Sequence, residues 1–427
     1  MERKKHLIFI VGYYYPNYSA NGVCVKKVID VLKATYTITI ICIKTQKGIQ
    51  DIEDYDSIRI VRIETGEQRV RNYVNSILEK SKSKVKKALV IPLLHAVQVR
   101  RYFNAIISKE NVIEAFVKGY IKALQEIEEV IDLIIPVCFP FESIVAALEY
   151  KRLYNSTVKI APYLLDKFSA SEGLHRTAWN KRVKLHRHLM LEKEMLEKSY
   201  SVLATDDWEE HLKYYFGNYI EKIKFVGIPA LCQMQKTSLI QYEDRKIHFV
   251  YTGALDYRIR PAEYALNLLS SCMTEKPEYI LSIYGWGNCD NIIDRFIENK
   301  PNQIINHGRV SVETAHNALT NADILLSIGN TDITQKPSKI YEYMACGKPI
   351  IHLYHDENDP TINILKKYGR ACFLDQDELK AELNKIEIIS FVEKYKAMPV
   401  ITFSEVRDKF LEATPEYTVQ ILKGLIE

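Results

Sequence analysis

The chain has 427 residues, of which 47% are hydrophobic and 26% charged, with a formal net charge of +4. This composition excludes an intrinsically disordered chain, and the length predicts two domains instead of one core. No segment approaches the roughly 20 apolar residues that a membrane-spanning helix needs, so we expect a chain that does not cross a bilayer.

The first half of the chain alternates short β-branched segments with longer helical patterns. Its apolar run at 7–11 is too short for the core of a signal peptide and is predicted to be the first buried strand. Further strands are expected at 37–43, 58–63, 132–137, 158–164 and 201–204, and helices at 22–34, 142–154 and 181–198. Strands that are apolar on both faces and separated by helices indicate βαβ units in a parallel sheet.

The same pattern begins again near residue 247. Strands are expected at 247–253, 281–285, 303–308, 323–329 and 348–354. The chain is therefore predicted to be an α/β protein with two Rossmann-like domains, 1–228 and 229–403, whose parallel sheets face a central cleft. A terminal helix at about 404–427 could pack back on the first domain. Ligands of open parallel sheets bind at the carboxyl ends of the strands, so this cleft is the expected site.

Glycines end the predicted strands of the second half, at Gly253, Gly285, Gly308 and Gly329. Each could be an ordinary turn, but together they predict backbone that a ligand can approach closely. After the first of them, Arg258 and Arg260 come just before Pro261, which is well placed at the start of a helix. Arginines at a helix start suit a phosphate, although two solvated loop arginines would give the same pattern.

The segment KPSKIYEYMACGKPII (336–351) predicts a short helix over about 338–346 that Gly347 stops in a left-handed conformation. Lys336 and Lys339 near its start predict an anion site. Glu342, one turn further on, could accept hydrogen bonds from the hydroxyls of a ribose. The alternative is an ordinary helix start with surface lysines. The buried stripe would be Ile340, Met344 and Ala345.

The segment TQKPSKIYEYMACGKPII (334–351) closely resembles the donor-binding signature of retaining glycosyltransferases of family 4, which have the GT-B fold. The resemblance covers the whole chain and is strongest over 247–351 and weak over 65–130. It implies transfer of a sugar from a nucleotide-diphosphate sugar, most readily a UDP-sugar, with no other cofactor and no bound metal. Further pieces that match in order are YTGAL with its arginines, IYGWG, HGRVSVETAHNALTNADILLSIG and YYYPNYSANGVCVKKVIDVL.

The resemblance also implies the roles of individual residues. Glu342 would bind the donor ribose. Lys339 and Arg260, with Arg258 as a substitute, would neutralise the leaving diphosphate, where negative charge develops in the transition state. The other implied donor-binding positions are Gly22 near the phosphates, Gly253 and Gly285 in the glycine turns, Gly308 and Val310 beside the base, and Lys336.

One position departs from the family pattern. A second glutamate often stands eight residues before the ribose-binding one, where it contacts the transferred sugar, and Thr334 occupies that place. Asp332 and Gln335 could take over its hydrogen bonds. This departure leaves two alternatives beside a transferase: a non-catalytic paralogue that binds the nucleotide sugar as a partner subunit, and a sugar-nucleotide epimerase of the same fold.

The acceptor side is less specific in the sequence. Residues 80–109 and 175–191 contain no acid; the lysines and arginines of the first stretch flank the apolar run 88–99, and those of the second lie beside Trp179. Such a pattern suits a lipid-phosphate acceptor or an anionic membrane surface, and equally a solvated face beside a core helix. Asp166 ends a predicted strand and could orient or deprotonate an acceptor hydroxyl, or merely cap the next helix. The expected acceptor is a saccharide or a lipid-linked saccharide of a surface glycan.

Other patterns are discounted. Asp54–Asp56 and Asp375–Asp377 imitate a metal-binding DxD motif but fall in loop-like segments outside the glycine-rich region. Nothing in the sequence resembles a nucleic-acid-binding module, so no nucleic acid is expected as a partner. The eight cysteines are scattered without a CxxC pair, which indicates buried thiols in a reducing cytoplasm, with the inner membrane face as a further location.

Overall fold

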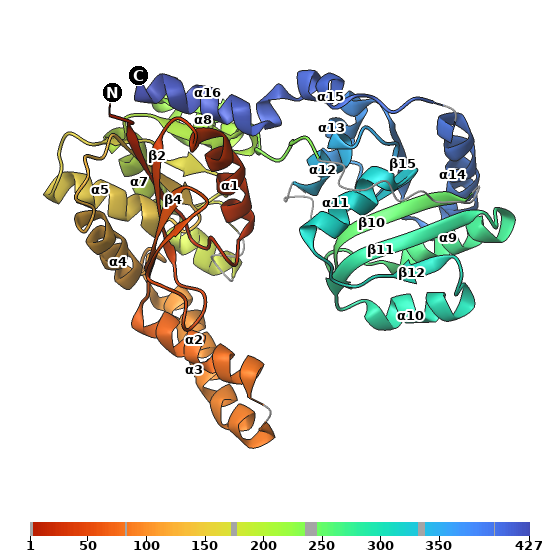
Figure 1. Cartoon of the computed structure of the whole chain (residues 1–427), viewed down its shortest axis with the longest axis horizontal. Coiled ribbons are helices and arrows are strands. Elements are labelled where there is room, and N and C mark those ends of the chain that lie inside the picture. The colour runs from red at the N-terminus through yellow and green to blue at the C-terminus, as the bar shows by residue number, and fades with distance from the viewer. Residues whose placement is uncertain (1–2, 82, 172–176, 235–245, 332–337, 397) are drawn as a thin grey trace. The chain divides into compact units, whose positions relative to one another are not determined.

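The computed structural model describes residues 3–81, 83–171, 177–234, 246–331, 338–396 and 398–427. The chain divides into two compact units: unit 1 is Met1–Pro229 together with Pro415–Glu427, and unit 2 is Ala230–Thr414. The sequence predicts the domain boundary between residues 228 and 229. Each unit is an α/β layer structure around its own sheet, as the sequence predicts (Figure 1).

Unit 1 contains a sheet in the order β3-β4-β2-β1-β5-β7-β8-β9, with β6 paired to β5. Every pairing is parallel except the hairpin of β3 and β4, which the sequence analysis missed because β3 is short, polar and largely exposed. The strands are β1 (His6–Ile10), β2 (Thr37–Ile43), β3 (Ile52–Tyr55), β4 (Ile58–Ile63), β5 (Leu133–Cys138), β6 (Lys159–Ile160), β7 (Tyr163–Leu164), β8 (Val202–Thr205) and β9 (Ile223–Val226).

The helices of unit 1 cover both faces of this sheet, and two apolar clusters fill the space between the layers. Helices α2 and α3 pack on each other and extend away from the sheet, as Figure 1 shows. The helices are α1 (Ala20–Leu32), α2 (Gly66–Lys80), α3 (Lys84–Ile107), α4 (Glu114–Gln125), α5 (Glu142–Leu153), α7 (Ala178–Lys198), α8 (Glu209–Phe216) and α16 (Pro415–Ile426), with 3-10 turns at Asp206–Trp208 and Gly217–Lys222.

Unit 2 contains a parallel sheet in the order β12-β11-β10-β13-β14-β15, and a large apolar cluster packs against it. Its strands are β10 (Ile247–Leu255), β11 (Tyr279–Gly287), β12 (Ile304–Asn306), β13 (Ile324–Ile328), β14 (Ile350–Tyr354) and β15 (Ala371–Asp375). Its helices are α9 (Glu263–Glu275), α10 (Asp290–Asn299), α11 (Val312–Asn321), α12 (Lys339–Ala345), α13 (Pro360–Tyr368), α14 (Ala381–Lys396) and α15 (Phe403–Lys409), with 3-10 turns at Glu378–Lys380 and Leu411–Ala413.

Two predicted elements are interrupted in the structure. The strand expected at 158–164 is two short strands, β6 and β7, separated at Pro162, which has no backbone N–H for the ladder. The terminal helix expected at 404–427 is also two helices. Only α16, which begins at Pro415, belongs to unit 1, where it packs on α1, and Lys5 Nζ donates to the Ile426 carbonyl at 2.8 Å.

Candidate functional site

A cavity of about 260 Å³ lies in unit 2 at the carboxyl ends of β10, β11 and β13, beside the first turn of α12. The helices that connect parallel strands cover the faces of the sheet and leave the carboxyl ends of the strands open. Side chains that follow the strands therefore converge there. None of the described residues that line the cavity is acidic. They are Tyr251, Thr252, Ala254, Arg260, Trp286, Ser327, Ile328, Asn330, Ser338, Lys339, Ile340 and Tyr343.

The Arg260 guanidinium is held in this cavity by three hydrogen bonds. Its Nε and Nη2 donate to Asn330 Oδ1 at 3.1 and 2.6 Å, and its Nη1 donates to the Ala254 carbonyl at 3.4 Å. The backbone of Arg260 pairs with that of Asp256, which closes a tight turn after β10. Arg258, on the same turn, is exposed, does not line the cavity, and has its guanidinium over the Tyr257 ring. The structure thus separates the two arginines that the sequence treated as interchangeable.

Lys339 is the second cation of the cavity. Its Nζ lies 5.5 Å from the centre of the Trp286 ring. Burial lowers the pKa of the Lys339 ammonium, the nearby Glu342 carboxylate partly opposes this effect, and Arg260 adds to it. Two cations that face a small and poorly hydrated space without an acid on its walls form a strong attractive field for an anion.

The glycines at the carboxyl ends of β10 and β11 allow the backbones of these two paired strands to approach closely. Gly253 is paired with Gly285, and both lie inside the strands, which continue two residues beyond the ends that the sequence predicted. A Cβ on Gly285 would lie 2.3 Å from the Gly253 carbonyl oxygen, so no side chain fits there. A Cβ on Gly253 would lie 3.6 Å from Lys339 Nζ, so the missing side chain keeps the space beside the ammonium open.

Helix α12 is fixed against the end of β10 by Tyr343. The Thr252 amide donates to Tyr343 Oη at 2.8 Å, and Tyr343 Oη donates to the Thr252 carbonyl at 3.2 Å. The predicted apolar stripe of this helix is confirmed, since Ile340, Met344 and Ala345 are buried. Gly347 has a φ of 68° and ends the helix in the left-handed region, also as predicted.

A chain of hydrogen bonds leads from the cavity into the core of unit 2. The Ser327 hydroxyl lies 3.0 Å from His352 Nδ1, and His352 Nε2 lies 3.1 Å from Asp359 Oδ2. His352 is fully buried, and Asp359 caps the start of α13. This chain fixes the direction of the Ser327 hydroxyl at the cavity wall. The sequence analysis missed it, because Ser327 lies within a strand and its partners lie 25 and 32 residues further along the chain.

Glu342, Gly308 and Val310, which the sequence also predicted as donor-binding residues, do not line this cavity. Glu342 is half-buried and close enough to influence the pKa of Lys339. Gly308 and Val310 follow the edge strand β12, next to the His307 ring, which stacks on Tyr284 with centroids 4.2 Å apart. Thr334 and Lys336, as well as Asp332 and Gln335, lie outside the described residues.

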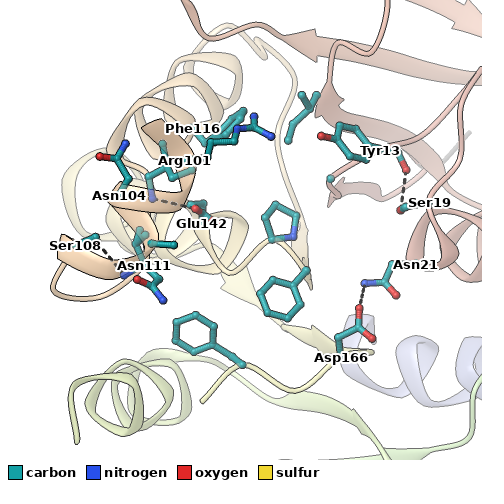
Figure 2. Close-up of a pocket in the computed structure, with 18 of the residues that line it drawn as sticks. Tyr13, Ser19, Asn21, Arg101, Asn104, Ser108, Asn111, Phe116, Glu142 and Asp166 are labelled. Atoms are coloured by element: carbon teal, nitrogen blue, oxygen red, sulfur yellow. Dashed lines mark hydrogen bonds between the residues drawn. The ribbon is translucent and has the colours of Figure 1, made fainter. Parts of the chain in front are cut away.

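Unit 1 has a larger cavity of its own, of about 690 Å³ (Figure 2). It lies at the carboxyl ends of β1, β5 and β7, and one side is formed by the last turns of α3. Its walls are mainly apolar, with rings and aliphatic side chains from Ile43, Val112, Ile113, Phe116, Phe139, Pro140 and Phe168. Its polar groups include Arg101, which is paired with Glu67, and Glu142, whose Oε1 accepts a 2.9 Å hydrogen bond from the Ile113 amide.

Asp166 lies on the wall of this cavity, as Figure 2 shows. Asn21 Nδ2 donates to Asp166 Oδ2 at 2.8 Å and to the Cys138 carbonyl at 3.2 Å. The carboxylate is reached by solvent through the cavity, yet the surrounding walls reduce its hydration and raise its pKa, and Asp207 adds to the effect while Asn21 opposes it. The sequence did not predict Asn21 as its partner, because 145 residues separate the two.

Gly22 lies in the first turn of α1, next to the same region of unit 1. Its amide donates to Ser19 Oγ at 3.1 Å, so it takes part in the N-terminal cap of α1. A Cβ at this position would lie 2.3 Å from the Tyr13 carbonyl oxygen, so the glycine allows the helix start to pack on the loop after β1.

The described residues contain no group of three or more His, Cys, Asp or Glu side chains arranged to hold a metal ion. In the same part of the chain, no helix combines the length and apolar character needed to cross a membrane.

No protein-family model matches the sequence, and no curated protein matches it. Solved structures do match over nearly the whole chain. Sucrose-phosphate synthase from Thermosynechococcus elongatus is 14% identical, with 99% of both chains covered and a TM-score of 0.58. The E. coli trehalose-6-phosphate structure bound with UDP-2-fluoro glucose is 10% identical, with 99% of both chains covered and a TM-score of 0.56.

A third similar structure is that of the lipopolysaccharide outer core galactosyltransferase WaaB in its apo form. It is 11% identical, with 98% of this chain and 99% of that chain covered and a TM-score of 0.54. The two Rossmann-like units are therefore those of the GT-B glycosyltransferase fold, as the sequence predicted. At these identities the likeness establishes the fold, and the reaction has to be argued from the site.

Proposed function

We propose that the protein is a glycosyltransferase that moves a sugar from a nucleotide-diphosphate sugar to an acceptor hydroxyl. The observation that carries this proposal is the pair of cations, Arg260 and Lys339, in an acid-free cavity at the carboxyl ends of parallel strands. A diphosphate is the group that such a pair would recognise, because two charge-assisted contacts can meet its separated negative charges. Binding of a UDP-sugar analogue by a protein of the same fold supports the choice of donor.

In this reaction the cations act on the leaving group. As the glycosidic bond to the diphosphate breaks, negative charge develops on the phosphate oxygens, and Arg260 and Lys339 stabilise that charge in the transition state. Arg260 is already oriented by Asn330 and the Ala254 carbonyl, so little reorganisation is required. Glu342 would bind the ribose hydroxyls, and Gly308 and Val310 would lie beside a uracil base.

We further propose that transfer proceeds with retention of configuration, as in the family 4 enzymes that residues 334–351 resemble. In that mechanism no protein side chain is a nucleophile, and an oxygen of the departing diphosphate receives the proton of the acceptor hydroxyl. The protein supplies position and charge stabilisation. Asp166 would accept a hydrogen bond from the acceptor hydroxyl and orient it, and Asn21 holds the carboxylate in place.

The acceptor we propose is a saccharide attached to an apolar carrier, in the synthesis of a surface glycan. The unit 1 cavity supports this choice, since it combines mainly apolar walls with a carboxylate that can accept a hydrogen bond from a hydroxyl. In a cavity of this kind, burial of apolar surface contributes binding energy, and a few polar groups orient the ligand. The enzyme would act at the cytoplasmic face of a membrane.

Calorimetry with UDP, ADP and GDP tests the donor site. We expect Arg260→Met to weaken nucleotide binding about 10- to 150-fold, because charge-assisted hydrogen bonds contribute about 1.5–3 kcal/mol. Arg258→Met is the matched control: it removes the same charge from the same turn but outside the cavity, and should change Kd less than about twofold. Equal effects of the two substitutions would show that Arg260 has no special role.

Incubation with a panel of nucleotide sugars tests the reaction itself. Acceptor-dependent release of free nucleotide is the expected result. Formation of a new nucleotide sugar would identify an epimerase instead. Binding without either product would identify a non-catalytic partner subunit.

A further inference from the structure

Helix α3 carries a continuous apolar stripe on its solvent-facing side. The stripe consists of Val85, Leu89, Leu93, Ala96, Val99, Phe103 and Ile107. Their spacings of three and four residues place them on one face of the helix. The large side chains are well exposed, with 70% of Val85, 69% of Leu89, 54% of Phe103 and 74% of Ile107 accessible to solvent. From Val85 to Ile107 the stripe is about 33 Å long, at a rise of about 1.5 Å per residue.

The opposite face of α3 is already occupied by the protein. Val90 is buried, Leu94 and Val97 are half-buried, and Arg101 and Ala105 line the unit 1 cavity. A surface helix with one packed face normally presents polar residues to water on the other. An apolar stripe of this length on the free face therefore indicates an interaction surface.

The charges around the stripe have one sign. No acid occurs between Glu79 and Glu110, a segment that contains α3 and eight lysines and arginines, of which Arg101 lies on the packed face and pairs with Glu67. A hollow of about 590 Å³ between α2 and α3 is lined by Lys80, Lys86 and Tyr73, among others, and includes Leu89 of the stripe. Cations that flank exposed apolar side chains are the arrangement with which a helix lies on an anionic lipid surface.

The start of α7 contacts the end of α3 and also carries exposed apolar side chains. Trp179, Val183 and Met190 are exposed at spacings of four and seven residues, so they share one face of α7. The two helices are joined where α3 ends, since Asn180 Nδ2 and Lys184 Nζ both donate to the Ala105 carbonyl, at 2.9 and 2.6 Å. The segment 175–191 again contains no acid.

We propose that the outer face of α3, together with the start of α7, docks on an anionic lipid bilayer. Charge complementarity decides between the bilayer and a second copy of the chain, because two acid-free basic helices would repel each other. Since the other side of α3 lines the unit 1 cavity, one helix would connect the membrane surface with the site of a lipid-linked acceptor. Only this last connection rests on the proposed function.

Sedimentation of the full chain with lipid vesicles tests the proposal. We expect binding to phosphatidylcholine vesicles that contain about 30% phosphatidylglycerol, weaker binding in high salt, and little binding to pure phosphatidylcholine. The double variant Leu89→Glu/Phe103→Glu should lower partitioning at least about tenfold, because it removes two apolar side chains from the lipid contact and adds two negative charges.

The matched control is Leu379→Glu/Leu383→Glu in unit 2, where the two leucines are 93% and 68% exposed. This variant should bind anionic vesicles nearly as the unchanged protein does. Both variants should keep the thermal unfolding midpoint and the affinity for UDP, so that a loss of vesicle binding is separable from a failure of the donor site.

Three results would overturn the proposal. The first is no binding to anionic vesicles, and the second is an equal loss of binding in both double variants. The third is a dimer in sedimentation velocity that the Leu89→Glu/Phe103→Glu variant abolishes without any vesicle binding, which would assign the stripe to self-association.

Discussion

The two cavities of the protein have opposite chemistry. The cavity of unit 2 is small, at about 260 Å³, and its character comes from two cations that hydrogen bonds and burial hold in place. The cavity of unit 1 is larger, at about 690 Å³, and combines mainly apolar walls with several carboxylates, of which Asp166 is held by Asn21. The first suits a compact anion of fixed geometry, and the second suits a bulkier group recognised mainly by apolar contact. Under the proposed function, charge stabilisation would belong to unit 2 and acceptor selection to unit 1, and each role can be tested separately.

The largest effect that we expect concerns the unit 1 cavity. Asp166→Asn should lower kcat about 100-fold and leave donor affinity unchanged, because a misoriented acceptor hydroxyl costs rate without affecting the nucleotide. The pKa of Asp166 is raised by its partly dehydrated surroundings, so in the unchanged protein kcat should fall as the pH drops through that raised pKa. The substituted protein should lack this acid limb. A parallel rise in donor Kd would contradict the separation of the two cavities.

The next effect concerns the unit 2 cavity. Lys339→Met should raise the Kd for UDP by about 10-fold or more, with Lys367→Met on the exposed face of α13 as the control. Burial lowers the pKa of Lys339 in the free protein, and a bound diphosphate would raise it again. Binding should therefore take up protons, and affinity should fall as the pH rises past the lowered pKa. Calorimetry in buffers of different ionisation enthalpy measures this uptake, which should vanish in Lys339→Met.

A smaller effect is expected one turn further along α12. Glu342→Ala should raise the donor Kd about tenfold, which corresponds to the loss of hydrogen bonds worth about 1.4 kcal/mol, and should leave the fold intact. Glu313→Ala, at an exposed position in the first turn of α11, is the control. An unchanged Kd in the Glu342 variant would exclude this residue as the ribose ligand.

The smallest effect is on stability. Glu142 is buried, and burial raises its pKa although the Ile113 amide donates to it. The folded protein thus binds this proton more tightly than the unfolded chain, so the contribution of Glu142 to stability is greatest below its unfolded pKa and is lost as the pH rises through the folded one. Glu142→Gln should be more stable than the unchanged protein near pH 7 by on the order of 1 kcal/mol. Chemical denaturation should show this gain disappearing at acidic pH.

Of the predicted donor residues that the structure describes, Arg260 and Lys339 line the unit 2 cavity, and both lie in segments with a clear local pattern. Lys339 and Glu342 lie one turn apart on a single helix, and Gly253 and Arg260 are seven residues apart around one turn. The sequence does not reveal the residues that hold the side chains of the cavity in place. Asn330 and Ser327 reach the cavity from the end of β13, and only the sheet topology places this strand beside β10.

The unit 1 cavity could not be assembled from the sequence for the same reason. Asp166 was predicted as a strand-end carboxylate, but its partner Asn21, the residue Glu67 and the last turns of α3 with Arg101 come from three other segments of the chain. The sequence pattern of the helices α2 and α3 is also weak. Because α3 is apolar on its packed face and on its outer face, its periodicity does not reveal which side faces the protein.

The position of α16 has a consequence for how the chain folds during synthesis. Unit 1 is built from two pieces of the chain, residues 1–229 and 415–427, whereas unit 2 is continuous between them. Because α16 packs on α1 and residues 230–414 come between the two helices in the chain, unit 2 can complete its core before unit 1 receives α16. Loss of residues 415–427 would remove the helix that packs on α1 and would leave the chain of unit 2 continuous.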